Sequence, residues 1–333
     1  INDAGLTITD EDSHSMGVSI GTTFGSLHSI SQFDRVGLVE GPRLVNPSLF
    51  PNTVINSPAS RVSIRFKIKG FNTTLSTGFC SGLDAISYAA DFITLNRADV
   101  VLAGGVEELC EETFMGFHNL GYLSGSDGSI PLCCPFDARR NGIILSEAAA
   151  VMVLEDVGHA IKRGAEILAV VEGYGNAFSP RRISDDRSPA KGFDHSGSGF
   201  KNAITLALKD ASLSANDIDY ISACANSTKG LDRMETHVIK DIFGDHAYRV
   251  PMSSIKSMVG ESFSASSALS LAAAVGAMRK RFIPPTVNYE ERDPECDLDY
   301  VPCNAREKHI NHVLVLSSDP YGNNATMALG RYE

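Results

Sequence analysis

The sequence predicts an α/β fold made of two comparable halves. Short apolar segments alternate with helical segments along the whole chain, which is the pattern of layered α/β folds. The chain has 333 residues, enough to bury a large core and to form two domains. Its 43% apolar residues, 29 Gly and 14 Pro are typical of a globular protein. We place the two halves at residues 1–157 and 158–333.

The elements of the first half are predicted from apolar runs and turn signals. Buried apolar runs predict strands at residues 15–21, 73–76 and 100–103, the last ending in Gly104-Gly105. Helical spacing predicts helices after residue 25, at 80–96 and at 114–124. Pro and Asn predict a loop at residues 42–54, and the apolar stretch 143–154 is expected to be partly β.

The second half repeats the alternation. It begins with a short helix at residues 158–163 and a strand at 167–171, and a polar surface loop is predicted at 176–197. Amphipathic spacing predicts a helix at residues 198–213, and the Ala- and Ser-dense run 264–280 predicts a helix suited to close packing. Strands are predicted at residues 219–223, 312–317 and 326–329.

Composition excludes several classes of function. The net charge of −11 argues against nucleic acid as a main partner, because phosphate binding needs clustered Lys and Arg. No apolar run approaches the ~20 residues of a membrane span. The seven cysteines show no CxxC spacing and favour a cytoplasmic, reducing compartment. The nine histidines form no HExxH pair, so we expect neither a metal nor another cofactor.

The beginning of the chain does not look like the start of a protein. It opens at Ile1 with no Met and no signal-peptide pattern. Residues 1–8 read like the end of a helix that is already under way. We therefore expect N-terminal sequence to be missing.

Residues 70–90, called the elbow below, form the stretch around which the chain is organised. A short strand leads into a tight turn at Thr77-Gly78, and a helix with small residues in its first turn begins at Cys80. Such a nucleophile elbow lifts one side chain into a pocket. The unpaired N–H groups of the helix can stabilise a thiolate or an oxyanion there.

The elbow resembles that of the β-ketoacyl synthases, condensing enzymes of the thiolase-like fold. The family pattern runs Gly-Pro-Asn-x-Ser-x-Ser-Thr-Ala-Cys-x-x-Gly, with the Cys as acyl-accepting nucleophile. The positions in register are Gly70, Asn72, Ser76, Thr77 and Gly82. This register places Phe79 at the nucleophile position and Cys80 one residue late.

Four further stretches resemble condensing-enzyme motifs, at residues 98–108, 134–156, 253–261 and 283–306. The retained family positions are Glu147, Asp232, Glu235, Lys256, Gly322 and Asn324. The resemblance implies a thiolase-like fold of two pseudo-repeated halves in an α-β-α-β-α arrangement.

The catalytic residues of the family are absent. Its members use a Cys thiolate and two His residues that polarise the thioester carbonyl and assist decarboxylation. By register, Cys224 and Glu261 stand where the two His residues should be. A carboxylate cannot donate the N–H hydrogen bond of an imidazole unless it is protonated. The late Gly-Phe-Gly-Gly-x-Asn loop, which helps form the oxyanion hole, reads DPYGNN at residues 319–324. The resemblance therefore leaves this chain with no catalytic residue.

One branch of the family shows this pattern of losses. Residues 81–86 and 123–127 resemble the chain length factors, the inactive partners of ketosynthases in type II polyketide systems. In those proteins Gln often replaces the nucleophile, whereas Phe79 does so here. The resemblance implies a heterodimer with an active ketosynthase, loaded from an acyl carrier protein, for an aromatic or polyene product. It also implies that residues 72–77 (Asn72 to Thr77) pair across the interface and that Leu27 and Ile30 line the acyl tunnel.

Several alternatives stay open at this point. Cys80 is either a shifted nucleophile or a small buried residue beside the elbow, and Phe79 fills either core or a vestigial pocket. Glu261 is a surface charge or a pocket-facing carboxylate, and Leu27 and Ile30 are tunnel lining or ordinary core. The chain itself could instead be a divergent synthase using Cys80, or a non-catalytic homodimer that binds acyl thioesters.

Overall fold

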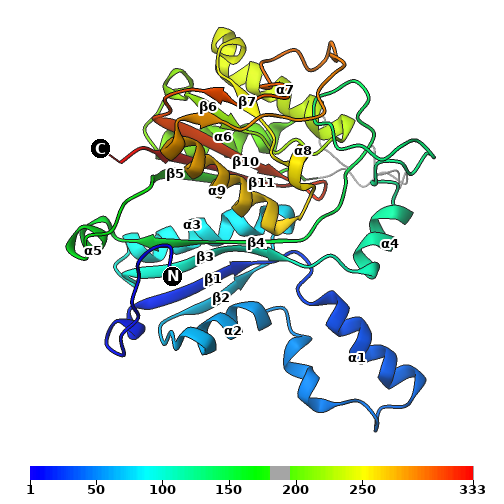
Figure 1. Cartoon of the computed structure of the whole chain (residues 1–333), viewed down its shortest axis with the longest axis vertical. Coiled ribbons are helices and arrows are strands. Elements are labelled where there is room, and N and C mark those ends of the chain that lie inside the picture. The colour runs from blue at the N-terminus through cyan, green and yellow to red at the C-terminus, as the bar shows by residue number, and fades with distance from the viewer. Residues whose placement is uncertain (181–195, 333) are drawn as a thin grey trace.

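The computed structural model describes residues 1–180 and 196–332. Two β-sheets lie face to face, with helices α3 (Ser81–Thr94) and α9 (Ser264–Lys280) packed between them (Figure 1). Further helices cover the outer face of each sheet. The chain therefore has the α-β-α-β-α layering that the resemblance implies.

The first sheet is formed by residues before 156. Its order is β2-β1-β3-β4, with β1 (Met16–Gly21) parallel to both β2 and β3 and with β4 antiparallel to β3. The other strands are β2 (Asn72–Leu75), β3 (Val100–Glu107) and β4 (Ala148–Glu155). Every residue of β1 is buried, as expected for a strand covered on both faces. Helix α2 (Ser57–Phe66) packs on the outer face against β1 and β2.

The second sheet is formed by residues after 169. Its order is β5-β11-β10-β6-β7. The strands are β5 (Val170–Phe178), β6 (Tyr220–Ser222), β7 (Met252–Ser253), β10 (His312–Ser318) and β11 (Asn323–Gly330). Helix α6 (Ser198–Asp210) packs on β5 and β11, and α7 (Lys229–Phe243) packs on α6.

The remaining elements are short or peripheral. The helices are α1 (Leu27–Val39), α4 (Glu111–Asn119), α5 (Val157–Lys162) and α8 (Lys256–Val259), and a small hairpin pairs β8 (Phe282–Ile283) with β9 (Arg306–Glu307). Short 3₁₀ segments lie at Asp12–His14, Pro47–Asn52, Gly78–Cys80, Ala215–Asp217 and Gly244–Tyr248. Within the described ranges, no helix is long and apolar enough to cross a membrane.

Small residues allow the two central helices to approach closely. A Cβ atom at Gly82 of α3 would lie 2.3 Å from the backbone oxygen of Ser264, at the start of α9. The predicted helix at residues 264–280 is confirmed at both ends, and its Ala and Ser side chains pack between the sheets as expected. This contact fixes the start of α9 directly beside the elbow.

Several predicted boundaries are wrong, for local physical reasons. Strand β3 does not end at Gly104 but continues to Glu107. The glycine is required inside the strand, since a Cβ at Gly104 would lie 2.0 Å from the backbone oxygen of Ala150 in the paired strand β4. Strand β5 extends to Phe178, into the predicted loop, while residues 181–195 of that loop lie outside the described residues. The predicted helix end at residues 1–8 is a series of turns.

Other predicted helices differ in position or were missed. The helix expected at residues 114–124 begins at Glu111 and ends at Asn119. The predicted loop at 42–54 contains the 3₁₀ turn Pro47–Asn52. Helix α7 was not predicted, although its apolar side chains recur at helical spacing. Those side chains are Leu231, Met234, Val238 and Ile239, all buried.

Residues 27–52, called the arm below, extend away from the two sheets (Figure 1). Helix α1 buries none of its residues. The exposed side chains of the arm include large apolar ones, with Leu38 exposing 87% and Leu44 exposing 65% of their full surface. The others are Val39, Leu49 and Phe50. Large exposed apolar side chains gathered on one segment are typical of an interaction site.

Candidate functional site

The elbow has the predicted sequence of strand, turn and helix. Strand β2 leads to Thr77, and the 3₁₀ turn Gly78–Cys80 precedes α3. Gly78 has a φ of 62°, and a Cβ there would lie 1.8 Å from Oδ2 of Asp319, so only glycine fits. The hydroxyl of Ser81 accepts a hydrogen bond from the N–H of Thr77 at 2.8 Å and closes the turn.

Phe79, at the nucleophile position, is enclosed by aromatic rings. Its side chain is 3% exposed, and its ring centroid lies 5.0 Å from that of Phe263 and 6.3 Å from that of Phe117. Phe24 packs edge-on against both of these rings. We call Phe24, Phe79, Phe117 and Phe263 the aromatic cluster. The cluster fills the space beside the elbow with rings that contain no nucleophilic atom.

Cys80 lies in a different part of the core from Phe79. Its side chain is 1% exposed and packs with apolar residues of α3 and α9, including Leu83 and Ala268. Burial raises the pKa of the Cys80 thiol well above its usual value, and the charges of Asp84 and Asp319 raise it further. The thiol is therefore protonated at neutral pH, and a protonated thiol is a poor nucleophile.

The two positions of the missing His residues lie together in a buried polar cluster. Glu261 is 1% exposed, so the alternative of a surface charge is wrong. Its Oε2 accepts hydrogen bonds from Nζ of Lys256 at 2.8 Å and from Nδ2 of Asn226 at 3.1 Å. Its Oε1 accepts the N–H of Phe263 at 3.1 Å. Both oxygens of the carboxylate are thus engaged.

Lys256 connects Glu261 to Cys224. The Lys256 ammonium also donates to the backbone oxygen of Cys224 at 3.0 Å. Burial lowers the pKa of Lys256, but the negative charges around it, Glu261 first, outweigh burial and hold that pKa above its usual value. Burial raises the pKa of the Cys224 thiol well above its usual value. The cluster therefore contains an ion pair and a neutral thiol where the family has imidazoles.

Asp232 and Glu235 hold the backbone around Cys224. Glu235 accepts the N–H groups of Cys224 at 2.8 Å and of Ala225 at 2.9 Å. Asp232 accepts the N–H of Phe136 at 2.8 Å. Burial raises the pKa of Asp232 to about 6 and that of Glu235 to about 7. The polar cluster, as we use the term, comprises Cys224, Asp232, Glu235, Lys256 and Glu261.

These raised pKa values predict a protein that becomes more stable as the pH falls from 8 to 5. Folding raises the carboxyl pKa of Glu235, and of Asp232 and Asp84 (each to about 6), so the folded state binds protons more tightly than the unfolded chain. The resulting stabilisation is lost as the pH rises through these values. We expect the free energy of unfolding to rise by roughly 2–4 kcal/mol over this range.

The measurement is urea unfolding at several pH values. Glu235→Gln should remove about half of the rise, because Gln does not titrate, whereas the same change at the exposed Glu40 should keep the wild-type slope. A Glu235→Gln slope equal to that of the wild type would contradict the assignment.

The other predicted positions are not all at this site. Gly322 and Asn324 shape the loop after β10, where Nδ2 of Asn324 donates to the oxygen of Gly322 at 2.9 Å. Glu147 is exposed, accepts the N–H of Leu109 at 3.2 Å and does not join the polar cluster. Leu27 and Ile30 lie half-buried at the base of the arm, outside the apolar core clusters of the chain.

Asn72 and Thr77 lie on or beside β2, which is an edge strand of the first sheet. Asn72 donates through Nδ2 to the oxygen of Ala59 at 2.9 Å and so ties the strand to α2. The hydroxyl of Thr77 hydrogen-bonds the carboxylate of Asp84. The outer edge of β2 has no partner strand within the described residues.

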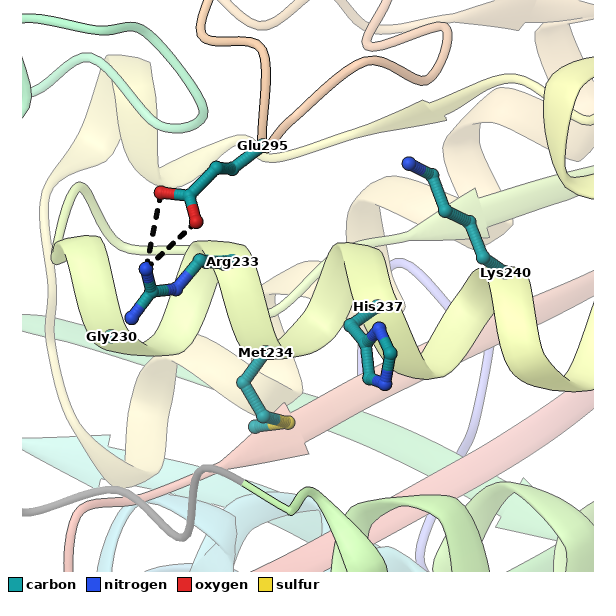
Figure 2. A pocket seen from close by; sticks show the side chains of 6 residues that line it. All are labelled: Gly230, Arg233, Met234, His237, Lys240 and Glu295. Carbon is teal, nitrogen blue, oxygen red and sulfur yellow. Dashed lines mark hydrogen bonds and ion pairs between the residues drawn. The ribbon is translucent and has the colours of Figure 1, made fainter.

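A cavity of about 490 Å³ lies along α7 and not at the aromatic cluster (Figure 2). Its charged side chains are already paired. Arg233 contacts both carboxylate oxygens of Glu295, at 2.9 and 3.1 Å, and Lys240 pairs with Asp297. His237 is exposed at its centre. Because its cations are neutralised, this cavity is a poor site for an anion.

Three features of this site were not predicted from the sequence. These are the aromatic partners of Phe79, the ion pair of Lys256 with Glu261, and the contact of Asp319 with the elbow. Lys256 and Glu261 are only five residues apart and carry opposite charges, so the sequence could have suggested this ion pair. The contact between Asp319 and Phe79 spans 240 residues and leaves no local signal.

Comparisons with known proteins identify the family and the fold. Two family models match, "Beta-ketoacyl synthase, N-terminal domain" over residues 1–160 and "Beta-ketoacyl synthase, C-terminal domain" over residues 169–290. A polyketide beta-ketoacyl synthase of Streptomyces halstedii is 40% identical over 96% of this chain and 76% of its own length. A 3-oxoacyl-[acyl-carrier-protein] synthase 2 of Coxiella burnetii is 37% identical over 99% of this chain and 78% of its own.

Solved structures give the same picture. The AntDE:AntF complex, a type II polyketide acyl carrier protein with its ketosynthase, superposes with a TM-score of 0.92 at 31% identity. The match covers 100% of this chain and 82% of that one. The ishigamide ketosynthase/chain length factor superposes with a TM-score of 0.90 at 33% identity, over 100% of this chain and 79% of that one.

Proposed function

The chain belongs to the β-ketoacyl synthase family, and we propose that it acts as the non-catalytic, chain length factor-like subunit of a type II polyketide ketosynthase pair. The observation that carries the proposal is the state of the nucleophile position. Phe79 occupies it, and its side chain is 3% exposed and packs against the other rings of the aromatic cluster. The ketosynthase partner supplies the chemistry, and this chain supplies interface and tunnel wall.

The polar cluster supports the same conclusion. Acyl transfer needs a thiolate, and decarboxylation needs imidazole donors beside it. Here the nearest thiols, Cys80 and Cys224, are buried and hold their protons. Glu261 is bound to Lys256 and cannot donate an N–H. The ion pair of Lys256 with Glu261 instead ties together the two loops at these positions.

The partner surface is formed by the arm and by the outer edge of β2. The arm exposes large apolar side chains, and β2 leaves a row of backbone groups without a partner strand in the described part of the chain. We propose that the ketosynthase binds to both surfaces and receives its acyl groups from the acyl carrier protein. Leu27 and Ile30, in the first turns of α1 at the base of the arm, would then face the growing acyl chain and limit its length by their bulk.

The direct test is a labelling experiment on the pair. The chain is incubated with an acyl thioester, alone and together with a type II polyketide ketosynthase that has an intact nucleophile, and the intact mass of each polypeptide is measured. We expect a stoichiometric acyl adduct on the ketosynthase and none at Cys80 or Cys224 of this chain, because these two thiols are buried and hold their protons. Cys80→Ala serves as the control and should leave the result unchanged.

An adduct mapped to Cys80 would overturn the proposal and favour the divergent synthase. Iodoacetamide labelling of the unfolded chain shows that every thiol is reactive when accessible. This control separates a buried thiol from one that is chemically blocked.

A further inference from the structure

The loop after β10 places a buried carboxylate directly on the elbow. Asp319 is 2% exposed. Its Oδ1 accepts the N–H groups of Tyr321 at 2.9 Å and Asn323 at 3.0 Å, and its Oδ2 accepts Nδ2 of Asn323 at 2.9 Å. Oδ2 also accepts the N–H of Phe79 at 3.3 Å. The loop's own backbone therefore holds the carboxylate in place.

In an active condensing enzyme, the backbone N–H at the position of Phe79 would point toward the oxygen of the reacting carbonyl. In acyl transfer, the backbone N–H of the nucleophile residue donates to the oxygen that becomes negative in the tetrahedral intermediate. In this chain the N–H at that position already has an anionic acceptor. The acceptor lies so close that a Cβ at Gly78 would be 1.8 Å from Oδ2.

The loop also lacks a donor of its own at this point. Pro320 follows Asp319, and proline has no backbone N–H. In the family pattern Gly-Phe-Gly-Gly-x-Asn, with Asn324 as the Asn, Asp319 and Pro320 replace the first Gly and the Phe. One potential donor is thus occupied and the next residue cannot donate.

We propose that Asp319 is an internal anion that occupies the oxyanion site of the elbow, so that acyl transfer is blocked independently of the missing nucleophile. The site is closed to an acyl oxyanion by occupation and by charge repulsion. This inference rests on the elbow geometry and does not depend on a ketosynthase partner.

The charge of Asp319 acts on its neighbours as well. Burial raises the pKa of Asp84 to about 6, and the nearby charge of Asp319 contributes to that rise. The charge of Asp319 also raises the pKa of the Cys80 thiol, and its contribution is smaller than those of burial and of the Asp84 charge. A thiol introduced at the elbow would therefore meet an environment that disfavours its thiolate as well as its oxyanion.

The test restores a nucleophile and then removes the carboxylate. In Phe79→Cys, the new thiolate would attack the carbonyl carbon of acetyl-N-acetylcysteamine. A carbon–sulfur bond would form through a tetrahedral oxyanion, the thioester carbon–sulfur bond would break, and N-acetylcysteamine would leave with the proton that the attacking thiol had lost. Iodoacetamide alkylates the same thiolate without forming an oxyanion. The ratio of the acylation rate to the alkylation rate therefore isolates the oxyanion site.

We expect Phe79→Cys with Asp319→Gly to raise this ratio at least tenfold over Phe79→Cys alone, since one oxyanion donor is worth about 10²–10³ in rate. Asp319→Asn in the same background removes the charge but still fills the space. It should accelerate both reactions and raise the ratio less than Asp319→Gly does, because the amide still occupies the site. An unchanged ratio in the Asp319→Gly variant would overturn the proposal.

A second measurement avoids the engineered nucleophile. Amide hydrogen exchange at Phe79 should be at least tenfold faster in Asp319→Gly than in the unmodified chain, because the acceptor of that N–H is removed. Exchange in β1, a strand of the other sheet, should be unchanged, which would show that the variant is folded. Equal protection of Phe79 in both proteins would contradict the assigned hydrogen bond.

Discussion

Replacing Lys256 with Met is expected to lower the free energy of unfolding by about 3–5 kcal/mol, the usual cost of breaking a buried ion pair. The substitution leaves Glu261, which is 1% exposed, without its cation. It also removes the donor that satisfies the backbone oxygen of Cys224. Urea unfolding followed by far-ultraviolet circular dichroism measures the change, since a chain with no Trp gives little fluorescence signal.

Two further variants make this result specific. Lys201→Met removes an exposed pair with Asp241, at 3.3 Å, and should cost less than about 1 kcal/mol. The double variant Lys256→Met, Glu261→Met removes both charges and should recover most of the loss, because no buried charge is left unpaired. If Lys256→Met cost no more than Lys201→Met, the pair would not be a buried structural element.

The sequence predicted the layered fold because its core elements carry strong local signals. The all-buried β1 and the Ala- and Ser-rich α9 were located to within one residue. Errors arose where tertiary packing overrides a local signal. Gly104 was interpreted as the end of a strand, but its missing side chain makes room for β4.

The candidate site was predictable in its positions and not in its contacts. Register placed Phe79, Cys224 and Glu261 at family positions, and the structure brings the last two together through Lys256. The separation of Phe79 from Cys80 into two different core clusters follows from the 3₁₀ turn between strand and helix. Asp319 reaches the elbow because the loop after β10 contacts residue 79, which is 240 positions earlier in the sequence. No local sequence pattern predicts a contact of this range.

The largest effect on assembly is expected from charging the arm. The double substitution Leu38→Glu, Leu44→Glu should weaken binding of the ketosynthase at least about 100-fold, because it would bury two unpaired carboxylates in the interface. The isolated chain should keep its stability, since these side chains are 87% and 65% exposed. Co-purification and light scattering after size-exclusion chromatography measure the loss of the heterodimer.

The matched control is Ile161→Glu on α5, a helix far from the arm in Figure 1, whose side chain is 56% exposed. It adds the same type of charge to an exposed apolar position and should leave the heterodimer intact. A double variant that still binds the ketosynthase would show that the arm is not the interface. A chain that is a dimer by itself, and a monomer only when the arm is charged, would instead assign the arm to a second copy. That outcome would replace the heterodimer with the acyl-binding homodimer.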